Sequence, residues 1–318
     1  MTESPFGFQH DALFFGSQDE LVESSVSFLD EGLAAGERVA LVCNAGHQKA
    51  LQEALGDHPS VTLLERDAMY RRAADAIASY RRLTQGMIAD GARRVRLVGE
   101  VDFGTEPESW REWMRFEAVC NHALSSLPLW SVCAYDTSRL SPDIITAGEL
   151  THPYVRAGAD RVPNPRFTDP AELIDQIMPD MSRPVEATQP TTRVSPVLSL
   201  AEVRHAVRQA INGRGVSSAH VDDYVVAVNE VVNNAVTHGR PPVEVRLWVT
   251  DEEWTCHVVD HGEGFHDPLV GYPAASDDAT LDGPLGLVLV RQLCDELAMR
   301  RTREGFVVRL TSHRRLEH

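Results

Sequence analysis

In the first half of the chain, short apolar runs rich in β-branched residues alternate with longer amphipathic stretches. Four runs have the composition of buried parallel strands: 38–43, 61–64, 95–98 and 129–135. Four stretches between them carry apolar residues at helical spacing: 20–33, 46–55, 69–89 and 109–124. The alternation predicts an α/β domain with a doubly wound parallel sheet covered by helices on both faces.

The pattern changes at about residue 156. Seven prolines are spread over 156–197, which also contains one short helical run at 171–178. Proline fixes φ and removes a backbone donor, so it disfavours a continuous helix or a central strand. We therefore expect an N-terminal domain at 1–170, a linker at 171–197 and a C-terminal domain at 198–315, with 180–197 as the most linker-like part.

The C-terminal domain has a different order of elements. Two helices are expected, at 200–211 and 221–238, and are followed by strands at 243–249 and 254–260. A glycine-rich loop, a helix at 285–296 and a hairpin of 298–302 with 306–311 complete the domain. This order predicts an α+β sandwich, in which a mixed sheet carries helices on one face.

Polar residues recur on the second of these helices. Glu230, Asn234 and His238 follow one another at intervals of four residues, so they share one face of the helix. An apolar stripe predicted to be buried runs beside them: Val225, Val228, Val232, Ala235 and Val236. An equally plain interpretation is that Asn233 and Asn234 are polar residues near a C-terminal cap at Gly239.

Two further motifs follow at the expected element boundaries. Asp260 ends a strand and leads directly into Gly262 and Gly264, where an Asp can also simply cap a turn. Gly283-Pro284-Leu285-Gly286-Leu287 then opens the next helix, whose backbone N–H groups can bind an anion. The order and spacing of the motifs are more specific than any one of them.

Residues 195–312 resemble the GHKL ATPases, specifically the branch of bacterial anti-sigma factors and related serine kinases. The resemblance rests on an N box at 230–239, a G1 box at 260–264 and a G2 box at 286–295. It implies a Bergerat-type sandwich that binds ATP and Mg²⁺, with Asn234 as the Mg²⁺ ligand and Glu230 as the catalytic base. The remaining nucleotide-binding residues that it implies are His238, Asp260, which accepts from the adenine amino group, Gly262, Gly264, Gly286 and Leu287.

Two departures from the family pattern bear on catalysis. Pro284 stands where the first glycine of the G2 box is usual, and Phe306 stands where a threonine often lies beside the adenine. Both favour nucleotide binding with weak or absent phosphate transfer. The segment 265–282 would serve as an ATP lid, although its composition also fits an ordinary surface loop.

Residues 8–168 resemble the MEDS family of sensory domains, through motifs at 10–15, 99–104 and 135–140. The resemblance implies a small-molecule sensor with a RecA-like or KaiC-like sheet, and it does not identify the ligand. Ligands bind such sheets beyond the ends of strands, which would gather Glu100, Asp102, Tyr135 and Asp136 at one crevice. Turn capping is at least as good an explanation for these four residues.

Other ligand sites are not indicated in this half. The turn after residue 43 has no GxxxxGK[ST] loop, so a P-loop nucleotide site is not expected. His10 could touch a ligand, but a histidine between Phe8 and Phe14 is more often a packed or half-exposed residue. No His/Cys spacing indicates a metal site.

Composition limits the partners and the compartment. A net charge of −17 disfavours direct nucleic-acid binding. Five scattered cysteines without a CxxC pair indicate reduced core thiols of a cytoplasmic protein, and no stretch is apolar enough to span a membrane.

The combined expectation is an anti-sigma regulator. Its sensory half would control an ATP-binding half that sequesters a sigma factor and phosphorylates an anti-anti-sigma protein of the STAS type, and related proteins suggest a homodimer. The alternative is a catalytically inactive, nucleotide-gated protein-binding module. A histidine-kinase-like fragment is a third interpretation, for which His205 is the only candidate phosphoacceptor.

Overall fold

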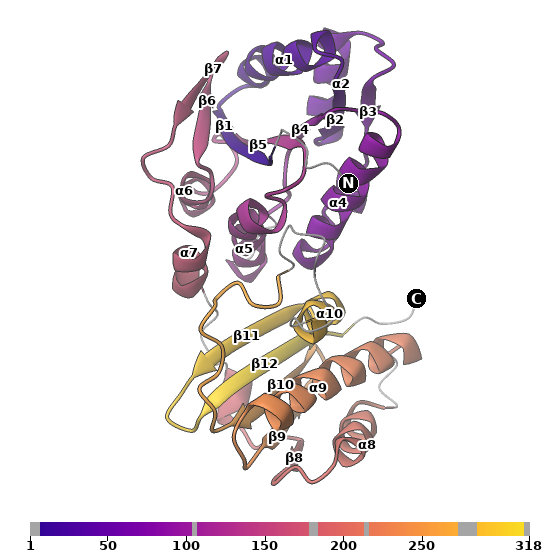
Figure 1. The fold of residues 1–318 in the computed structure, drawn as a ribbon, viewed down its shortest axis with the longest axis vertical. Coiled ribbons are helices and arrows are strands. Elements are labelled where there is room, and N and C mark those ends of the chain that lie inside the picture. The colour runs from indigo at the N-terminus through magenta and orange to yellow at the C-terminus, as the bar shows by residue number, and fades with distance from the viewer. Residues whose placement is uncertain (1–6, 104–106, 178–183, 213–215, 273–284, 315–318) are drawn as a thin grey trace. The chain divides into compact units, whose positions relative to one another are not determined.

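The structure, a computed structural model, describes residues 7–103, 107–177, 184–212, 216–272 and 285–314. The elements up to Ile177 form one compact unit, and those from Pro184 onward form a second (Figure 1). Pro284 and Gly283 lie outside the described residues, as does most of the expected lid. Within the described part of the chain, no helix is both long and apolar enough to cross a membrane.

The N-terminal unit is built on a seven-stranded sheet with the order β3-β2-β4-β5-β1-β6-β7. All neighbouring strands are parallel except β6 and β7, which form an antiparallel hairpin at one edge. The strands are β1 (Gln9–Phe15), β2 (Arg38–Val42), β3 (Val61–Leu63), β4 (Val95–Gly99), β5 (Leu129–Asp136), β6 (Tyr154–Ala157) and β7 (Asp160–Pro163).

Helices cover both faces of this sheet, as the alternating pattern predicts (Figure 1). They are α1 (Gln18–Ala34), α2 (Ala45–Leu55), α3 (Arg66–Met69), α4 (Ala73–Ala89), α5 (Pro107–Ala123), α6 (Pro142–Thr151) and α7 (Pro170–Ile177). Leu29 of α1 and Leu51 of α2 share a core with Leu41 of β2 and Val132 of β5. On the opposite face, Gly148 of α6 lies against the ring of Tyr135. The α/β class and the doubly wound arrangement are therefore confirmed.

One predicted helix is divided. The stretch 69–89 contains the end of α3 and all of α4, with a break at Tyr70. The break turns the Tyr70 side chain into the core, where its hydroxyl hydrogen-bonds that of Tyr80. The apolar spacing alone does not reveal this interruption.

The central strand β1 was not expected, because polar His10 and Asp11 interrupt its apolar residues. Both side chains are nevertheless buried. Asp11 accepts a hydrogen bond of 2.8 Å from Trp130 Nε1 and forms an ion pair with Arg161 of β7 at 2.9 Å. A buried charge is tolerated when it is paired in this way.

The C-terminal unit contains a five-stranded sheet with the order β11-β12-β10-β9-β8. Its strands are β8 (Thr192–Val194), β9 (Glu244–Val249), β10 (Glu253–Asp260), β11 (Glu296–Arg301) and β12 (Phe306–His313). Every pair is antiparallel, so the expectation of a mixed sheet is wrong. The connections between β9 and β10 and between β11 and β12 are short turns, which join antiparallel neighbours.

Three helices pack on one face of this sheet and share its core: α8 (Leu200–Ile211), α9 (Ser218–His238) and α10 (Leu285–Leu293). The helix α10 ends three residues earlier than expected, because Glu296 begins β11. The prediction that Val236 is buried is wrong, since this side chain is 55% exposed. In the last turn of α9, Ala235 is the buried apolar residue.

The other face of the sheet is covered by part of the predicted linker, which includes η1 (Pro184–Ala187). Glu186 forms ion pairs with His257 at 3.2 Å and with Arg309 at 3.3 Å, and Trp248 Nε1 donates to the Thr188 carbonyl at 3.1 Å. This segment and β8 thus belong to the C-terminal unit. All five cysteines of the chain are buried free thiols, as expected.

Candidate nucleotide-binding site

A pocket of about 350 Å³ opens in the C-terminal unit, between the end of α9, the loop after β10, the start of α10 and the beginning of β12. It is lined by Val231, Asn234, Ala235, His238, Gly239, Arg240, Asp260, Gly262, Glu263, Gly264, Phe265, His266, Leu287, Phe306 and Val308. Six of the residues singled out in the sequence are among them: Asn234, His238, Asp260, Gly262, Gly264 and Leu287. This volume lies within the range of small-molecule sites.

Asp260 lies at the end of β10 and is buried. Its Oδ1 accepts hydrogen bonds from the backbone N–H of Gly262, at 2.6 Å, and of Arg240, at 3.3 Å. Within the described residues, Oδ2 has no hydrogen-bond partner. One oxygen of this carboxylate therefore fixes its orientation, and the other remains free to accept a hydrogen bond from a ligand.

Two glycines make room for this carboxylate. A Cβ on Gly239 would lie 2.6 Å from both Cγ and Oδ1 of Asp260, and one on Gly262 would lie 2.7 Å from Oδ1. Gly239 does cap α9, since its N–H donates to the Ala235 carbonyl, but its φ is −81°. Glycine is therefore needed at position 239 because a side chain would not fit, and not because the backbone is left-handed.

Phe306 and Gly264 form the apolar side of the pocket. Gly264 has a φ of +76°, and a Cβ there would overlap the ring of Phe306. The Phe306 ring also contacts that of Phe265 edge to face, with centroids 5.9 Å apart. Phe306 is paired with Asp260 across β10 and β12, so an aromatic ring stands beside the carboxylate where the family often has a hydroxyl.

Glu230, Asn234 and Gly286 meet at the junction of α9 and α10. A Cβ on Gly286 would lie 3.0 Å from Glu230 Oε2 and 3.7 Å from Asn234 Nδ2. Because the backbone of α10 approaches this closely, its first turn lies beside both polar side chains. Asn234 itself is partly exposed and makes no hydrogen bond through its amide to the described residues.

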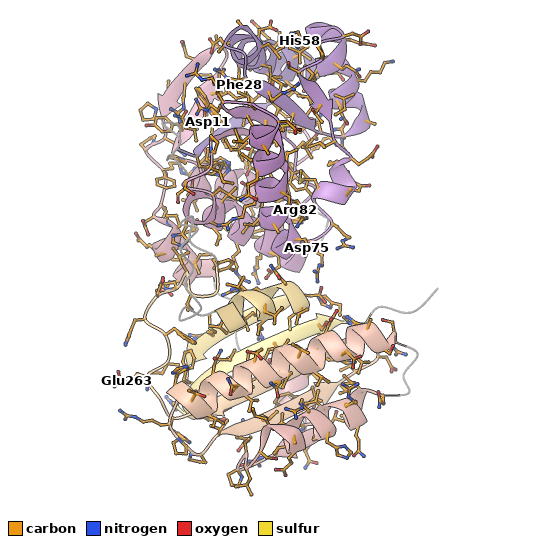
Figure 2. The ribbon with its side chains drawn as sticks, turned by 45° about the vertical axis from the view of Figure 1, so that its right-hand side comes forward. Asp11, Phe28, His58, Asp75, Arg82 and Glu263 are labelled. Carbon is orange, nitrogen blue, oxygen red and sulfur yellow. The ribbon has the colours of Figure 1, made fainter. Side chains whose placement is uncertain are left out.

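The described start of the expected lid is anchored on α10. Arg291 donates to the Val270 carbonyl at 3.3 Å and stacks over the Tyr272 ring at 3.9 Å. Gly271 packs against Leu287, where an added Cβ would meet that of Leu287 at 2.9 Å. The beginning of this segment is therefore packed against α10, the helix that also borders the pocket. Glu263, on the loop after β10, points outward from the unit (Figure 2).

Sequence reasoning did not single out several lining residues, among them Gly239 as a site residue, Arg240 and Val308. Helical spacing offered one signal, because Val231 and Ala235 lie one turn apart beside Asn234. Strand alternation offered another, because Phe306 and Val308 point to the same face of β12.

The three acidic residues expected at one crevice of the N-terminal unit have partners within that unit, and Tyr135, expected beside them, is buried. Glu100 accepts from the backbone N–H of Asn44 at 3.0 Å and pairs with His47. Asp136 accepts from the N–H of Ser138 at 3.0 Å. Asp102 is exposed and pairs with an arginine, and Tyr135 is buried. Glu100 and Asp136 thus have the capping role that the sequence left open.

Comparison with known families agrees with this division. Residues 9–153 match the model of the MEthanogen/methylotroph, DcmR Sensory (MEDS) domain. Residues 194–312 match the model of the histidine kinase-like ATPase domain. A search of curated proteins found no match. The chain therefore consists of a MEDS sensory domain followed by a histidine kinase-like ATPase domain.

Proposed function

We propose that the C-terminal unit binds Mg-ATP in the GHKL manner and that this binding controls the association of the protein with a sigma factor. The main support is the convergence of Asp260, three close glycines and the start of α10 on one pocket. The N-terminal unit would act as a RecA-like or KaiC-like sensor that adjusts this output. Its ligand would be a small molecule.

The geometry favours one orientation of the nucleotide in the pocket. The free Oδ2 of Asp260 is a suitable acceptor for an exocyclic amine, which favours adenine over guanine, and Phe306 offers a ring for the base to pack against. The first turn of α10, beside Gly286, offers backbone N–H groups to phosphates. The adenine would thus lie at the end of β10 and the phosphates at α10.

The residues also fit a magnesium ion carried by the nucleotide. Mg²⁺ prefers oxygen ligands and keeps several waters, so the single amide oxygen of Asn234 is a sufficient protein ligand when phosphates supply others. Glu230, one helical turn before Asn234, would orient the attacking hydroxyl or water. We propose a STAS-type antagonist as the recipient of the phosphate.

Mg-ATP binding is tested with two neighbouring asparagines. Asn234 lines the pocket, whereas Asn233 is exposed and does not. We expect Asn234→Ala to weaken Mg-ATP binding by about tenfold or more, because a ligand to the ion is lost, while Asn233→Ala changes it less than about twofold. Isothermal titration calorimetry measures both affinities. Absence of Mg-ATP binding by the unmodified chain, or equal losses in the two variants, contradicts the proposal.

Phe306 supports a second candidate, a nucleotide-gated binding module without kinase activity. Its ring occupies the position of the family's threonine and packs on Gly264. The two candidates differ in one measurement: incubation with radiolabelled Mg-ATP, a purified sigma factor and a STAS protein. Phosphorylated STAS protein supports the kinase, whereas a nucleotide-dependent complex with sigma and no phosphoprotein supports the module.

A further inference from the structure

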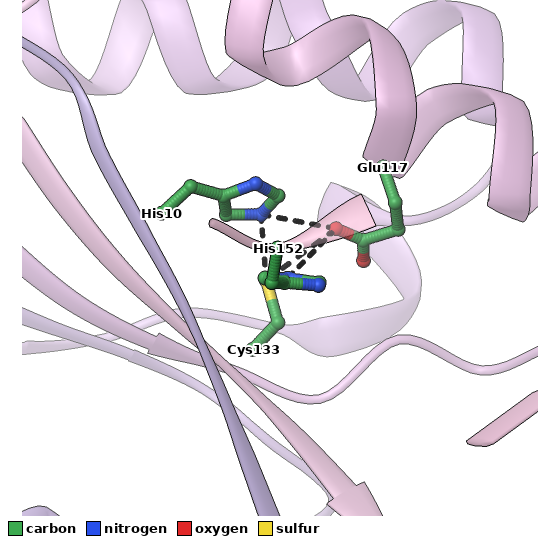
Figure 3. A group of neighbouring side chains, drawn as sticks. All are labelled: His10, Glu117, Cys133 and His152. Carbon is green, nitrogen blue, oxygen red and sulfur yellow. Dashed lines mark hydrogen bonds and ion pairs between the residues drawn. The ribbon is translucent and has the colours of Figure 1, made fainter. Parts of the chain in front are cut away.

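Four metal-binding side chains meet in the interior of the N-terminal unit (Figure 3). They come from four places: His10 from β1, Glu117 from α5, Cys133 from β5 and His152 from the residue after α6. None is more than 3% exposed. Their candidate ligand atoms all lie within 4.8 Å of one another.

Four of the six separations among these atoms are close to the edges of a small tetrahedron, and the other two are below 4.8 Å. His10 Nε2 lies 3.1 Å from Glu117 Oε2 and 3.3 Å from Cys133 Sγ. Glu117 Oε2 lies 3.5 Å from His152 Nε2 and 3.6 Å from Cys133 Sγ. Metal–ligand bonds of about 2.0–2.3 Å in tetrahedral geometry place neighbouring ligand atoms about 3.3–3.8 Å apart. A single ion thus fits between these atoms with little movement.

Hydrogen bonds on the outer side of each imidazole direct Nε2 inward. His152 Nδ1 lies 2.8 Å from the Gly148 carbonyl, which can only accept, so Nδ1 carries the proton. Asn121 donates to the Thr151 carbonyl through Nδ2, which leaves its Oδ1 to accept from His10 Nδ1 at 3.2 Å. A polar atom that holds the outer nitrogen of a histidine is typical of metal sites.

Both histidine rings therefore present a lone pair to the cluster. His152 Nε2 is buried and accepts no hydrogen bond from the described residues. A buried lone pair without a hydrogen-bond donor is unfavourable, and a metal ion between these atoms would satisfy it.

We propose that His10, Glu117, Cys133 and His152 bind one divalent transition-metal ion of the zinc class. Imidazole and thiolate ligands select such metals over Mg²⁺ and Ca²⁺, which prefer all-oxygen sites. One thiolate and one carboxylate balance the two positive charges of the ion, so the buried site is neutral as a whole. With four protein ligands and no solvent access, the ion holds β1, β5, α5 and α6 together.

This site cannot be predicted from the sequence, because the four ligands lie far apart along the chain and share no motif spacing. The expectation that His10 is a packed residue agrees with its burial. It does not include the neighbouring Glu117, Cys133 and His152. The parallel pairing of β1 with β5 sets His10 beside Ser131 and close to Cys133. Glu117 and His152 reach them from α5 and from the end of α6.

The test uses the full-length chain, treated with a chelator and then titrated with Co²⁺ in the absence of nucleotide. We expect one equivalent of Co²⁺ to bind, with the strong visible absorption of a tetrahedral site and a thiolate-to-cobalt charge-transfer band. Cys133→Ser should remove the charge-transfer band. Cys43→Ser is the matched control, because it makes the same change at another buried thiol of this unit outside the cluster, and it should keep the band.

Competition with Zn²⁺ then gives affinities. We expect Glu117→Gln to weaken binding by at least about 100-fold and Asn121→Ala by about 10–100-fold, since Asn121 acts through His10. Circular dichroism and Mg-ATP binding by the same preparations report folding and the other site separately. No stoichiometric binding by the unmodified chain, or an unchanged spectrum in Cys133→Ser, overturns the proposal without bearing on nucleotide binding.

Discussion

Among single residues, Gly239 is required by the space around it, because an added Cβ would lie 2.5 Å from the Ala235 carbonyl oxygen of its own helix as well as close to Asp260 of the neighbouring strand. Its φ of −81° is open to alanine, but a Cβ would lie 2.6 Å from the Asp260 carboxylate. Gly239→Ala should therefore displace Asp260 and break its hydrogen bonds to backbone N–H groups, which are worth about 1.5–3 kcal/mol each for a charged acceptor. We expect Mg-ATP affinity to fall by about tenfold or more in calorimetry.

Gly86 provides the control for this substitution. It is an exposed glycine in the interior of α4, and nothing lies within 4 Å of an added Cβ. Gly86→Ala should stabilise the protein by about 0.5–1 kcal/mol and leave nucleotide affinity unchanged. If Gly239→Ala binds Mg-ATP as tightly as Gly86→Ala does, the crowding against Asp260 has no functional consequence.

The residues of the nucleotide pocket were largely within reach of the sequence. Helical spacing put Glu230, Asn234 and His238 on one face of α9, and Asn234 and His238 do line the pocket. Their chemical roles stay predictions. The contact of Phe306 with Gly264 was out of reach, because it depends on the register that pairs Phe306 with Asp260.

Among the secondary-structure elements, those with a clear apolar period were predicted well and those with buried polar residues were not. The helix α8 has the predicted bounds, and β2 and β4 agree within a residue or so. The strand β1 was missed because His10 and Asp11 conceal its apolar pattern. The strand β8 was missed because it is short and lies among prolines.

The segment that covers the second face of the C-terminal sheet yields a stability prediction. Glu186 pairs with the fully buried Arg309, which also pairs with Glu296. Glu186→Gln should destabilise this unit by about 1–3 kcal/mol, because a buried guanidinium loses a charged partner. Chemical denaturation monitored by circular dichroism measures the loss.

The matched control is Glu252→Gln, which changes an exposed residue in the turn between β9 and β10. We expect its effect to stay within about 0.5 kcal/mol. Equal free energies of unfolding for the two variants would contradict this prediction. They would mean that the ion pairs of Glu186 add nothing to the stability of the unit.

For the chain as a whole, the sequence predicts two domains but does not assemble sites from distant segments. The change of element order and the prolines are local properties that indicate a boundary, yet α7 of the predicted linker groups with the first unit and η1 and β8 group with the second. The cluster of His10, Glu117, Cys133 and His152 depends on the order of strands in a parallel sheet, which no local pattern specifies. Its discovery required the tertiary structure.

Each unit has its own core, which predicts that their unfolding can be resolved by calorimetry. Leu51→Ala in α2 and Leu247→Ala in β9 remove fully buried side chains, and each should destabilise its own unit by about 2–5 kcal/mol. Each variant should therefore lower the midpoint of one transition and leave the other in place.

The two variants then assign the effect of the nucleotide. Mg-ATP at 100 times its dissociation constant should add about 2.7 kcal/mol to the stability of one unit, because the proposed site lies in that unit. The affected transition should be the one that Leu247→Ala shifts. The transition that Leu51→Ala shifts should stay in place. Asn234→Ala, with an affinity about tenfold lower, should reduce the stabilisation at the same nucleotide concentration to about 1.4 kcal/mol. A rise of both midpoints would mean that nucleotide binding is energetically coupled to the sensory unit, which is the route by which a sensed ligand could in turn alter nucleotide affinity.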